Sequence, residues 1–471
     1  MQSKQNKPQG QIKNLKSHLY NAKKGDLLTA FLNLECCQQI IKESRQFRRR
    51  IYTPLQTTLS FIKQVLDADK SCNNAVISVA AERLSEGKKT ISINTGPYVK
   101  ARKRLPEETV HQLVSAVGKE SLKTASVSWK PYGREVKLCD GTTVQMPDTK
   151  ANEHVYPKHN NKKKNIGFPL TRIVAVMSLT TGSIIDYAME ACKGKGTGEI
   201  SLLRKIFGCI EENDLLIFDR LYCNFFLTCD LLSKNTDIIV PGHNQRCYDF
   251  RKGLRLNKKD HSVAWIKPRR PEWMTQQEYA QYPKQILIRE FKVGGVVYIT
   301  TLLDAQKYHK KELALIYKRR WEMETNLNSI KTIMGMDKLS CKSPDMIKKE
   351  IGVHFLAYNI IRHIMVNACI QHDAFPNKVS FKGTIQLLNE FMPYLITCSS
   401  KRKWWLFVSE LLRLIVTKKV GHRLGRCEPR AVKGRPKTFP VLRKSRKVEQ
   451  DKLQKKVNKI IKMIENETLA A

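Results

Sequence analysis

Residues 171–190 read TRIVAVMSLTTGSIIDYAME, and this stretch decides the fold class. Two apolar runs of strand length flank a central Thr-Thr-Gly, which is a sequence typical of the turn in a β-hairpin. The pattern then alternates: residues 199–210 have apolar side chains at helical spacing, and residues 214–218 (DLLIF) form a short apolar run. Antiparallel strands followed by alternating helix and strand predict an α/β domain with a mixed sheet.

The segments on either side of this stretch differ in their patterns. Residues 27–85 read as helical, and residues 136–139 are a further strand candidate that ends at Asp140-Gly141. Residues 243–303 are rich in Lys, Arg, Pro and aromatic residues and end in two strand-like runs, which indicates a β-rich insertion. A long helical pattern follows over residues 311–334, and further apolar helices extend to about residue 417.

The charge of the chain indicates its partner. Of the 471 residues, 84 are Lys or Arg and 43 are Asp or Glu, which leaves a formal net charge of +41. Such an excess repels itself unless a polyanion shares the surface, so nucleic acid is the first partner to expect and a membrane surface the second. Five polar residues interrupt the most apolar helical stretch, residues 352–370, and argue against a membrane span: His354, Asn359, Arg362, His363 and Asn367.

The N-terminus and the cysteines suggest a cytoplasmic protein. Residues 1–24 contain no apolar segment of the kind found in a secretory signal. The 13 cysteines include no C-x-x-C pair, and they are too scattered to form a zinc site with the histidines. We therefore expect reduced and mostly buried thiols.

The helix expected over residues 311–334 carries the most informative set of side chains. Tyr317, Arg320, Glu324 and Lys331 follow one another at spacings of three, four and seven residues. At about 100° per residue they form one stripe about 60° wide. Such a stripe suits a phosphate ligand, because Glu can hold a metal while Arg and Lys neutralise phosphate oxygens. The alternative is an ordinary surface ion pair between Arg320 and Glu324.

Two aspartates each follow an apolar strand candidate, where α/β sheets position ligand-binding side chains. They are Asp140, after residues 136–139, and Asp219, after DLLIF. The alternatives are a simple Asp-Gly turn at Asp140 and a capping role for Asp219. With Glu324 the two aspartates supply three hard oxygen ligands suited to Mg²⁺ or Mn²⁺, as two-metal phosphoryl transfer requires.

Together these features resemble the DDE transposases of bacterial insertion sequences, of the insertion-sequence-four type. The hallmark of that type is Y-x₂-R-x₃-E-x₆-K, and Tyr317, Arg320, Glu324 and Lys331 match it at every spacing. Asp140 in LCDGTTVQMPDT and Asp219 in IFDRLY are similar to the contexts of the two family aspartates. The segments FRRRIYTPLQ and CEPRAVKGRPKTFPVL also look like family segments, so the resemblance covers about residues 46–443.

The resemblance implies a ribonuclease-H-like mixed-sheet catalytic core with a β-rich insertion, flanked by helical N-terminal and C-terminal regions. Asp140, Asp219 and Glu324 would hold Mg²⁺, with Mn²⁺ as a substitute. Tyr317, Arg320 and Lys331 would contact the DNA backbone near the cleaved end. The expected parts are a helical DNA-binding region at 1–125, the first part of the core at 126–242 and the insertion at 243–303. The second part of the core with the glutamate helix follows at 304–385, and then a basic and helical region at 386–471 that is a candidate for dimerisation.

The implied reaction is metal-dependent cleavage of DNA at the terminal inverted repeats of the element, followed by strand transfer of the 3′-hydroxyl into target DNA by a cut-and-paste route. The expected partners are double-stranded DNA and a second copy of the chain in a synaptic complex, without a membrane, in the bacterial cytoplasm at the nucleoid. A ribonuclease-H-like nuclease without strand transfer and a non-catalytic DNA-binding protein derived from a transposase are the alternatives.

Some relatives of this family place a tryptophan that accommodates a flipped base near the end of the β insertion. In this sequence the corresponding residues 294–303 contain Tyr298 and no tryptophan, and Trp265 and Trp273 lie earlier. The base-flipping role therefore has no assignment.

Basic segments outside the core are candidates for DNA contacts. Residues 99–105 form a basic helical segment after a polar turn, which a DNA-contacting helix needs, although a solvated basic face is the alternative. Residues 418–447 are basic and contain three prolines, which predicts an extended strap across DNA. Residues 158–164 form a similar basic loop. The candidate residues are Lys100, Arg102, Arg104, Arg426, Arg430, Lys433 and Arg435.

The last helix expected, at residues 448–466, carries an apolar stripe. This stripe either dimerises with a second copy or docks on the same chain. Its members are Leu453, Val457, Ile460, Ile461 and Ile464.

Overall fold

The computed structural model describes residues 32–44, 51–158, 167–243, 245–398, 400–421 and 446–469. The N-terminal part is helical, as expected, and its helices begin at clear signals. Thr53 caps α4 by accepting a hydrogen bond from the Gln56 amide at 3.2 Å, and Pro54 occupies the first helical position. The helices of this part are α3 (Glu35–Glu43), α4 (Pro54–Leu66), α5 (Cys72–Ser85), α6 (Gly96–Arg104) and α7 (Glu107–Thr124).

The predicted hairpin and the mixed sheet are confirmed. Strands β2 (Leu170–Ser178) and β3 (Ile184–Ala191) pair antiparallel, and the turn between them places Gly182 at φ 72°, which glycine adopts without strain. Strand β1 (Val136–Gln145) pairs antiparallel with β2 and parallel with β4 (Leu215–Ile217), which pairs parallel with β5 (Asp237–Pro241). Three antiparallel strands followed by two parallel ones, in the order β3-β2-β1-β4-β5, make a ribonuclease-H-like sheet.

Strand β1 is longer than the sequence indicated. We expected it to end at a turn formed by Asp140-Gly141, but it continues to Gln145. The reason is its partner: β2 pairs with β1 without a break from Lys137 to Gln145, so both residues lie inside a ladder. The turn interpretation of Asp140-Gly141 is therefore wrong.

The β-rich segment extends the core sheet. It contains β6 (Leu254–Asn257), β7 (Asp260–Ile266), α11 (Gln276–Gln281), β8 (Gln285–Val293) and β9 (Val296–Thr300). Strand β9 pairs antiparallel with β5, so all strands join in one nine-stranded sheet with the order β3-β2-β1-β4-β5-β9-β8-β7-β6.

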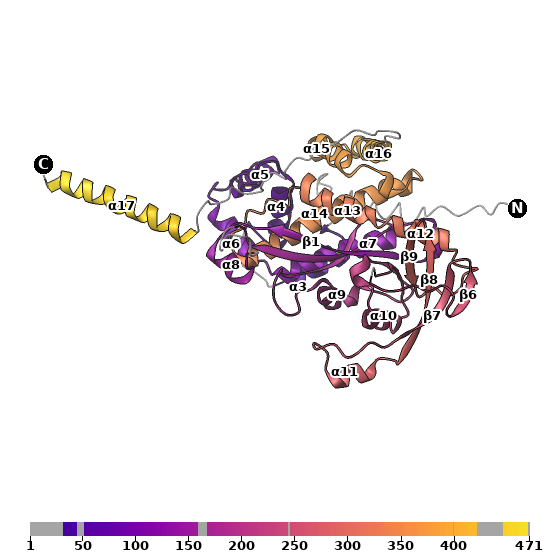
Figure 1. Ribbon diagram of the computed structural model, residues 1–471. Helices are drawn as coiled ribbons and strands as arrows, with labels where there is room; N and C mark the ends of the chain where they lie inside the picture. Colours follow the sequence, from indigo (N-terminus) through magenta and orange to yellow (C-terminus); the bar gives the residue numbers. More distant parts are fainter. Residues whose placement is uncertain are drawn as a thin grey trace.

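Helices cover both faces of this sheet (Figure 1). Helices α9 (Glu199–Lys205) and α10 (Phe225–Leu232) bury Leu202, Leu203 and Phe226 against one face, together with Cys139 of β1. Helix α14 (Pro344–Gln371) lies on the other face, in the core cluster that contains Leu138. Successive residues of β1 thus point to opposite helical layers, as the pleat of a strand requires.

The polar residues that interrupt the apolar stretch of helix α14 are buried inside the protein. By length and hydropathy α14 is the one described helix that could cross a membrane, but nearly all of it is buried inside the protein. Asn359 donates to the carbonyls of Val114 (2.9 Å) and Ile184 (2.7 Å) and accepts from the Ile184 amide (2.8 Å). Its amide joins α14, α7 and β3, so this polar residue of the apolar stretch serves helix–sheet packing.

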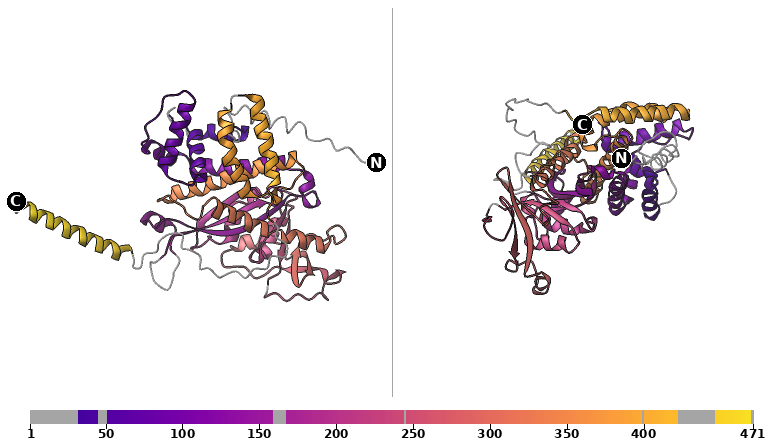
Figure 2. Two further views of the ribbon diagram at one scale, coloured as in Figure 1. Left: turned by 90° about the horizontal axis from the view of Figure 1, so that it is seen from above. Right: turned by 90° about the vertical axis from the view of Figure 1, so that its right-hand side faces the viewer.

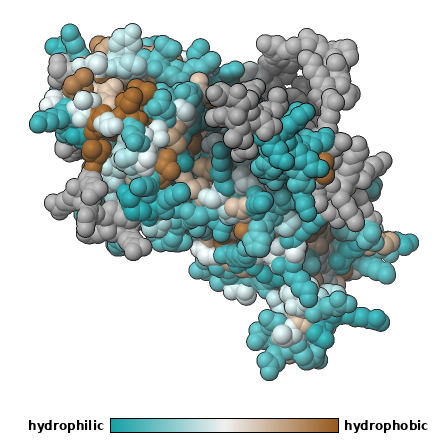
Figure 3. Space-filling view, turned by 90° about the vertical axis from the view of Figure 1, so that its left-hand side faces the viewer, coloured by the Kyte–Doolittle hydropathy of each residue, from teal (hydrophilic) through white to brown (hydrophobic). Residues whose placement is uncertain are grey.

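Helices α12 (Lys310–Lys318) and α13 (Trp321–Asn328) belong to the same layer as α14, because they bury Leu313 and Met323 in its core cluster. The other helices are α8 (Lys150–Val155), α15 (Phe381–Thr397), α16 (Lys401–Thr417) and α17 (Arg446–Leu469). Helix α17 projects away from the body of the protein (Figure 2), and Arg446 at its start pairs with Asp148 at 2.8 Å. The face on the left of Figure 1 is largely hydrophilic, apart from one gathering of hydrophobic side chains (Figure 3).

Candidate active site

An open edge of β1 marks the site. Strand β4 pairs with only three residues of β1, Val136, Lys137 and Leu138, because β4 ends at Ile217. Beyond Leu138 no strand covers this side of β1 within the described residues. The chain that leaves β4 carries Asp219 at this place, so two of the predicted carboxylates come from neighbouring parallel strands.

Asp140 points from β1 towards the helical layer that contains α13, because it shares the face of Leu138. Its carboxylate accepts from the Gly141 amide at 2.8 Å and from Arg320 Nη1 at 3.1 Å. Burial raises the pKa of Asp140, and the charges of Asp219 and Glu324 raise it further, while the Gly141 amide and Arg320 lower it. The charges of the other two predicted carboxylates therefore both act on Asp140.

The helix that carries Arg320 and Glu324 is not the single straight helix we predicted. It divides into α12, which ends at Lys318, and α13, which ends at Asn328, and a π-helical turn (Ser329–Ile333) follows. The stripe calculated for one regular helix is therefore only approximate. The hydrogen bonds that hold this segment to β1 decide where the side chains lie.

Arg320 bridges two of the carboxylates. Besides Asp140 it binds Glu324, with Nη2 to Oε1 at 2.7 Å. The i,i+4 ion pair with Glu324, which was the alternative interpretation from the sequence, is present, and Arg320 also contacts Asp140, 180 residues away in the chain. The Arg320 side chain is 21% exposed and Asp140 18%, so the bridge is more protected than a surface ion pair.

Lys331 and Tyr317 hold the same segment at its two ends. Lys331 Nζ donates to Thr142 Oγ1 and to the Thr143 carbonyl, both at 3.0 Å on β1. Tyr317 packs edge-on against Tyr298 at 5.2 Å between ring centroids. Burial raises the pKa of Tyr317, and Asp219 also raises it while Arg320 lowers it, which places the phenol beside the carboxylates.

Asp219 has a local role as well. It is the N-cap of the short turn Arg220–Tyr222, and its Oδ1 accepts from the Leu221 amide at 2.8 Å. The capping alternative is thus correct, and it fixes the carboxylate at the end of β4. Capping leaves further lone pairs on the same carboxylate for a ligand.

A fourth carboxylate, Glu199, lies at this site, where the sequence indicated only a helix start. Burial raises the pKa of Glu199, and the charges of Asp219 and Asp140 raise it further, whereas Arg172 and the Tyr222 hydroxyl lower it. Tyr222 Oη donates to Glu199 Oε2 at 3.4 Å. The sequence contained one signal for a close approach at this place, which is the glycine at position 141 inside strand β1.

The donor set fits a divalent cation in its chemistry. Within the part of the chain that the structure describes, no three Asp, Glu, His or Cys side chains are already arranged around a metal position. The physical reason is Arg320, whose guanidinium holds oxygens of both Asp140 and Glu324. Asp140, on which two other carboxylate charges act, needs a positive charge nearby. Carboxylate oxygens are the ligands that Mg²⁺ and Mn²⁺ prefer.

The candidates for DNA contact outside the core separate into three groups. Lys100 and Arg104 are exposed on α6. Arg102 is buried: it donates to Gln64 Oε1 at 2.8 Å and to Cys341 Sγ at 3.6 Å, and it lies over the Phe61 ring. A DNA contact does not fit Arg102, because on a helix that packs against α4 one side faces inward. Arg426, Arg430, Lys433 and Arg435 lie outside the described residues, as do most of residues 158–164.

Two of the three aromatic residues considered for base flipping are buried. Tyr298 is 4% exposed and stacks on Phe291 at 5.3 Å between ring centroids. Trp265 donates its ring N–H to Glu290 at 3.0 Å, with Arg246 over its face. Trp273 is exposed. Neither Tyr298 nor Trp265 can receive an unstacked base without repacking.

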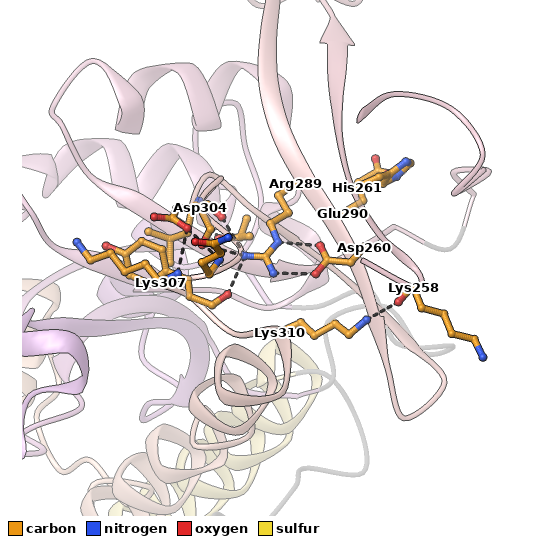
Figure 4. A network of polar contacts seen from close by, with 12 residues as sticks. Lys258, Asp260, His261, Arg289, Glu290, Asp304, Lys307 and Lys310 are labelled. Atoms are coloured by element: carbon orange, nitrogen blue, oxygen red, sulfur yellow. Dashed lines mark hydrogen bonds and ion pairs between the residues drawn. The ribbon is translucent and has the colours of Figure 1, made fainter. Parts of the chain in front are cut away.

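A buried arginine joins the insertion to the segment before α12 (Figure 4). Arg289 of β8 forms a two-pronged ion pair with Asp260 of β7, both contacts at 2.8 Å, and both side chains are fully buried. It also donates to the Tyr308 carbonyl at 2.8 Å, just before α12 begins. The glutamate helix therefore starts from a loop anchored in the β-rich insertion.

Comparisons with known proteins found transposases that are similar to this chain. Residues 131–360, which span β1, the insertion and α13, match the family described as "Transposase DDE domain". The chain is 25% identical over 364 residues to the transposase InsG of insertion sequence element IS4 from Escherichia coli (strain K12), covering 73% of this chain and 77% of the relative. A solved structure of the piggyBac transposase synaptic complex with hairpin DNA aligns over 85% of each chain, with 10% identity and a TM-score of 0.40.

Proposed function

We propose that this chain is a DDE transposase of the IS4 type, and that it cleaves DNA at the ends of its own insertion sequence and transfers the freed 3′-hydroxyl to target DNA. Its similarity to the family over residues 131–360 and to the IS4 transposase over 73% of the chain supports the proposal. Asp140, Asp219 and Glu324 are the metal-binding carboxylates in this proposal. Tyr317, Arg320 and Lys331 bind the DNA backbone beside the cleaved bond. Two copies of the chain act together on the paired ends, by a cut-and-paste route.

One observation carries the proposal. Arg320 joins Asp140 of β1 to Glu324 of α13 at the open edge of β1, and the charge of Asp219, after the end of β4, also acts on Asp140. Bringing like charges together disfavours folding unless a cation compensates them, so the arrangement has a purpose other than stability. Phosphoryl transfer on DNA provides that purpose.

Arg320 has a specific part in this proposal. Its guanidinium neutralises Asp140 and Glu324 in the free protein. A phosphodiester is an equally good bidentate partner for arginine, so a bound DNA end draws Arg320 away from the carboxylates. Asp140, Asp219 and Glu324 would then hold Mg²⁺, which would supply activation of the attacking oxygen and stabilisation of the leaving oxygen.

The other residues of the motif position the reacting bond. Lys331, anchored on β1 through Thr142 and Thr143, keeps the π-helical turn against the strand that carries Asp140. Tyr317 presents its hydroxyl on the same side, between Arg320 and the insertion. Both side chains are thus held at the edge of the site, where a backbone phosphate would lie.

The test is cleavage of a duplex that contains the terminal inverted repeat, with Mg²⁺ or Mn²⁺. We expect Asp140→Asn, Asp219→Asn and Glu324→Gln each to abolish cleavage while end binding persists in a gel-shift assay. The matched control is Glu322→Gln, which removes the same charge from α13. Its carboxylate pairs with Arg319 at 2.8 Å, and no contact joins it to Asp140.

Joining of a pre-cut 3′-hydroxyl end to a second duplex decides between this proposal and its alternatives. Cleavage without joining would favour a ribonuclease-H-like nuclease. Binding without cleavage by the unmodified chain would favour a DNA-binding protein. Full cleavage by Glu324→Gln would overturn the assignment of the site.

A further inference from the structure

The Glu199 carboxylate occupies the space where a side chain at position 141 of β1 would lie. Glu199 is the first residue of α9, which lies on the face of the sheet opposite α13. On that face Gly141 follows Cys139 along β1. A Cβ atom built on Gly141 would be 2.4 Å from Glu199 Oε1 and 2.5 Å from its carboxyl carbon. The Glu199 carboxylate therefore lies directly over the backbone of Gly141.

The glycine at position 141 has no conformational reason to be there. It pairs with Val174 inside the β1–β2 ladder, and its φ lies outside the left-handed region that glycine alone tolerates. Glycine within a strand costs stability and commonly marks a close approach. The close approach here is that of Glu199, so the missing side chain admits the carboxylate next to Asp140.

The neighbours of Glu199 belong to the site already described. Tyr222, which donates to it, ends the turn that Asp219 caps. The charges of Asp219 and Asp140 both act on Glu199. A glutamate in the first turn of a helix is often only a favourable partner of the helix dipole. That role needs neither the glycine opposite nor two aspartates nearby.

We propose that Glu199 is a fourth carboxylate of the metal-binding site and contributes an oxygen to the cation shared by Asp140 and Asp219. This inference rests on the proposed function. Glu199 reaches the site from the α9 layer across Gly141, whereas Glu324 reaches it from the α13 layer. The two glutamates thus approach the open edge of β1 from opposite faces of the sheet.

The experiment is a titration of the full chain with Mn²⁺ alone, without DNA, in which free Mn²⁺ is followed by electron paramagnetic resonance. We expect Glu199→Gln to weaken Mn²⁺ binding roughly 10- to 100-fold, as Asp140→Asn does. The matched control is Glu190→Gln, which removes the same charge from β3. Its carboxylate pairs with the exposed Lys205, and binding should not change.

A second variant keeps every carboxylate. Gly141→Ala places a methyl group where the Glu199 carboxylate lies, so it should weaken Mn²⁺ binding to a similar extent with the charge intact. Circular dichroism shows whether each variant is folded.

The outcomes distinguish the role of Glu199 from the metal site of the proposed function. Wild-type affinity in both Glu199→Gln and Gly141→Ala, with loss in Asp140→Asn, overturns the role of Glu199 and leaves the proposed function standing. Wild-type affinity in Asp140→Asn as well, or no Mn²⁺ binding by the unmodified chain, overturns the metal site itself. Loss in all three variants supports both.

Discussion

Replacing Arg289 with leucine should open the β-rich insertion. The substitution leaves Asp260 fully buried without its partner and removes a donor from the Tyr308 carbonyl. Breaking a buried ion pair by removing one member costs about 3–5 kcal/mol, because the remaining charge is uncompensated. The elements that lose stability are β7, β8 and the loop that leads to α12 (Figure 4).

Hydrogen–deuterium exchange measures this loss locally. Peptides that cover Asp260–Ile266 and Gln285–Val293 report the free energy of opening of β7 and β8. At 1.4 kcal/mol for each tenfold, the expected loss corresponds to roughly two to three and a half orders of magnitude in protection. Peptides from β2 and β3, at the other end of the sheet, should change far less.

Two further proteins check the reasoning. The double change Arg289→Leu with Asp260→Leu should recover most of the protection, because replacing a whole buried pair with apolar residues is often neutral. Arg251→Leu, which breaks an exposed pair with Asp249 in the same insertion, should have no measurable effect. If Arg289→Leu lowers the free energy of opening of β7 and β8 by less than about 1 kcal/mol, or if the double variant recovers no protection, the buried pair does not stabilise the insertion as expected.

Changes at three other places, Gly118, His111 and the basic helix α6, have defined outcomes. Gly118→Ala puts a Cβ 2.1 Å from a carbonyl of β3 and should lower the free energy of unfolding by about 1–3 kcal/mol in urea denaturation. Burial opposes charging of His111, but the hydrogen bond and charge of Asp186 outweigh it and raise its pKa. The pair of charged His111 with Asp186 stabilises the fold at low pH, and this contribution is lost as pH rises through the raised pKa of His111. His111→Gln should therefore lower the melting temperature more below about pH 6 than above about pH 8. Arg102→Met should destabilise the fold, whereas Lys100→Ala should reduce the salt slope of DNA binding by about 0.9 with stability unchanged.

Each of these changes has its own control. Gly208→Ala meets no atom within 4 Å and should leave the free energy of unfolding unchanged. His154→Gln, at an exposed position of α8, should show no pH-dependent difference in melting temperature. A uniform effect of His111→Gln at all pH values would contradict the ion pair with Asp186. A Lys100→Ala protein with an unaltered salt slope would remove α6 from the DNA-binding surface.

Local patterns predicted the parts of the fold that depend on neighbouring residues. The Thr-Thr-Gly turn between β2 and β3 and the DLLIF strand are examples, because strand period and turn chemistry are encoded within a few positions. The end of β1 was misjudged, since Asp-Gly is a turn signal in isolation, whereas a paired β2 keeps the strand extended to Gln145. The break between α12 and α13 was missed, because a regular period does not reveal a segment held at both ends.

Arg102 shows the same limit at a candidate site. A run of basic residues predicts affinity for phosphate, and Lys100 and Arg104 remain exposed for that role. Which residue of the run turns inward depends on the helix packed against it, and here Gln64 of α4 and Cys341 accept from Arg102. Sequence spacing alone has no access to that packing.

The sequence by itself determined the chemistry of this protein: which residues are acidic or basic, and the three- and four-residue spacings that bring Tyr317, Arg320 and Glu324 near one another on one segment. Such spacings act through the geometry of a single helix. Only the tertiary structure decided that Asp140 meets Arg320 across 180 residues and that Glu199 lies over Gly141. These contacts join different layers of the sheet, so they depend on strand order and on which helix covers which face.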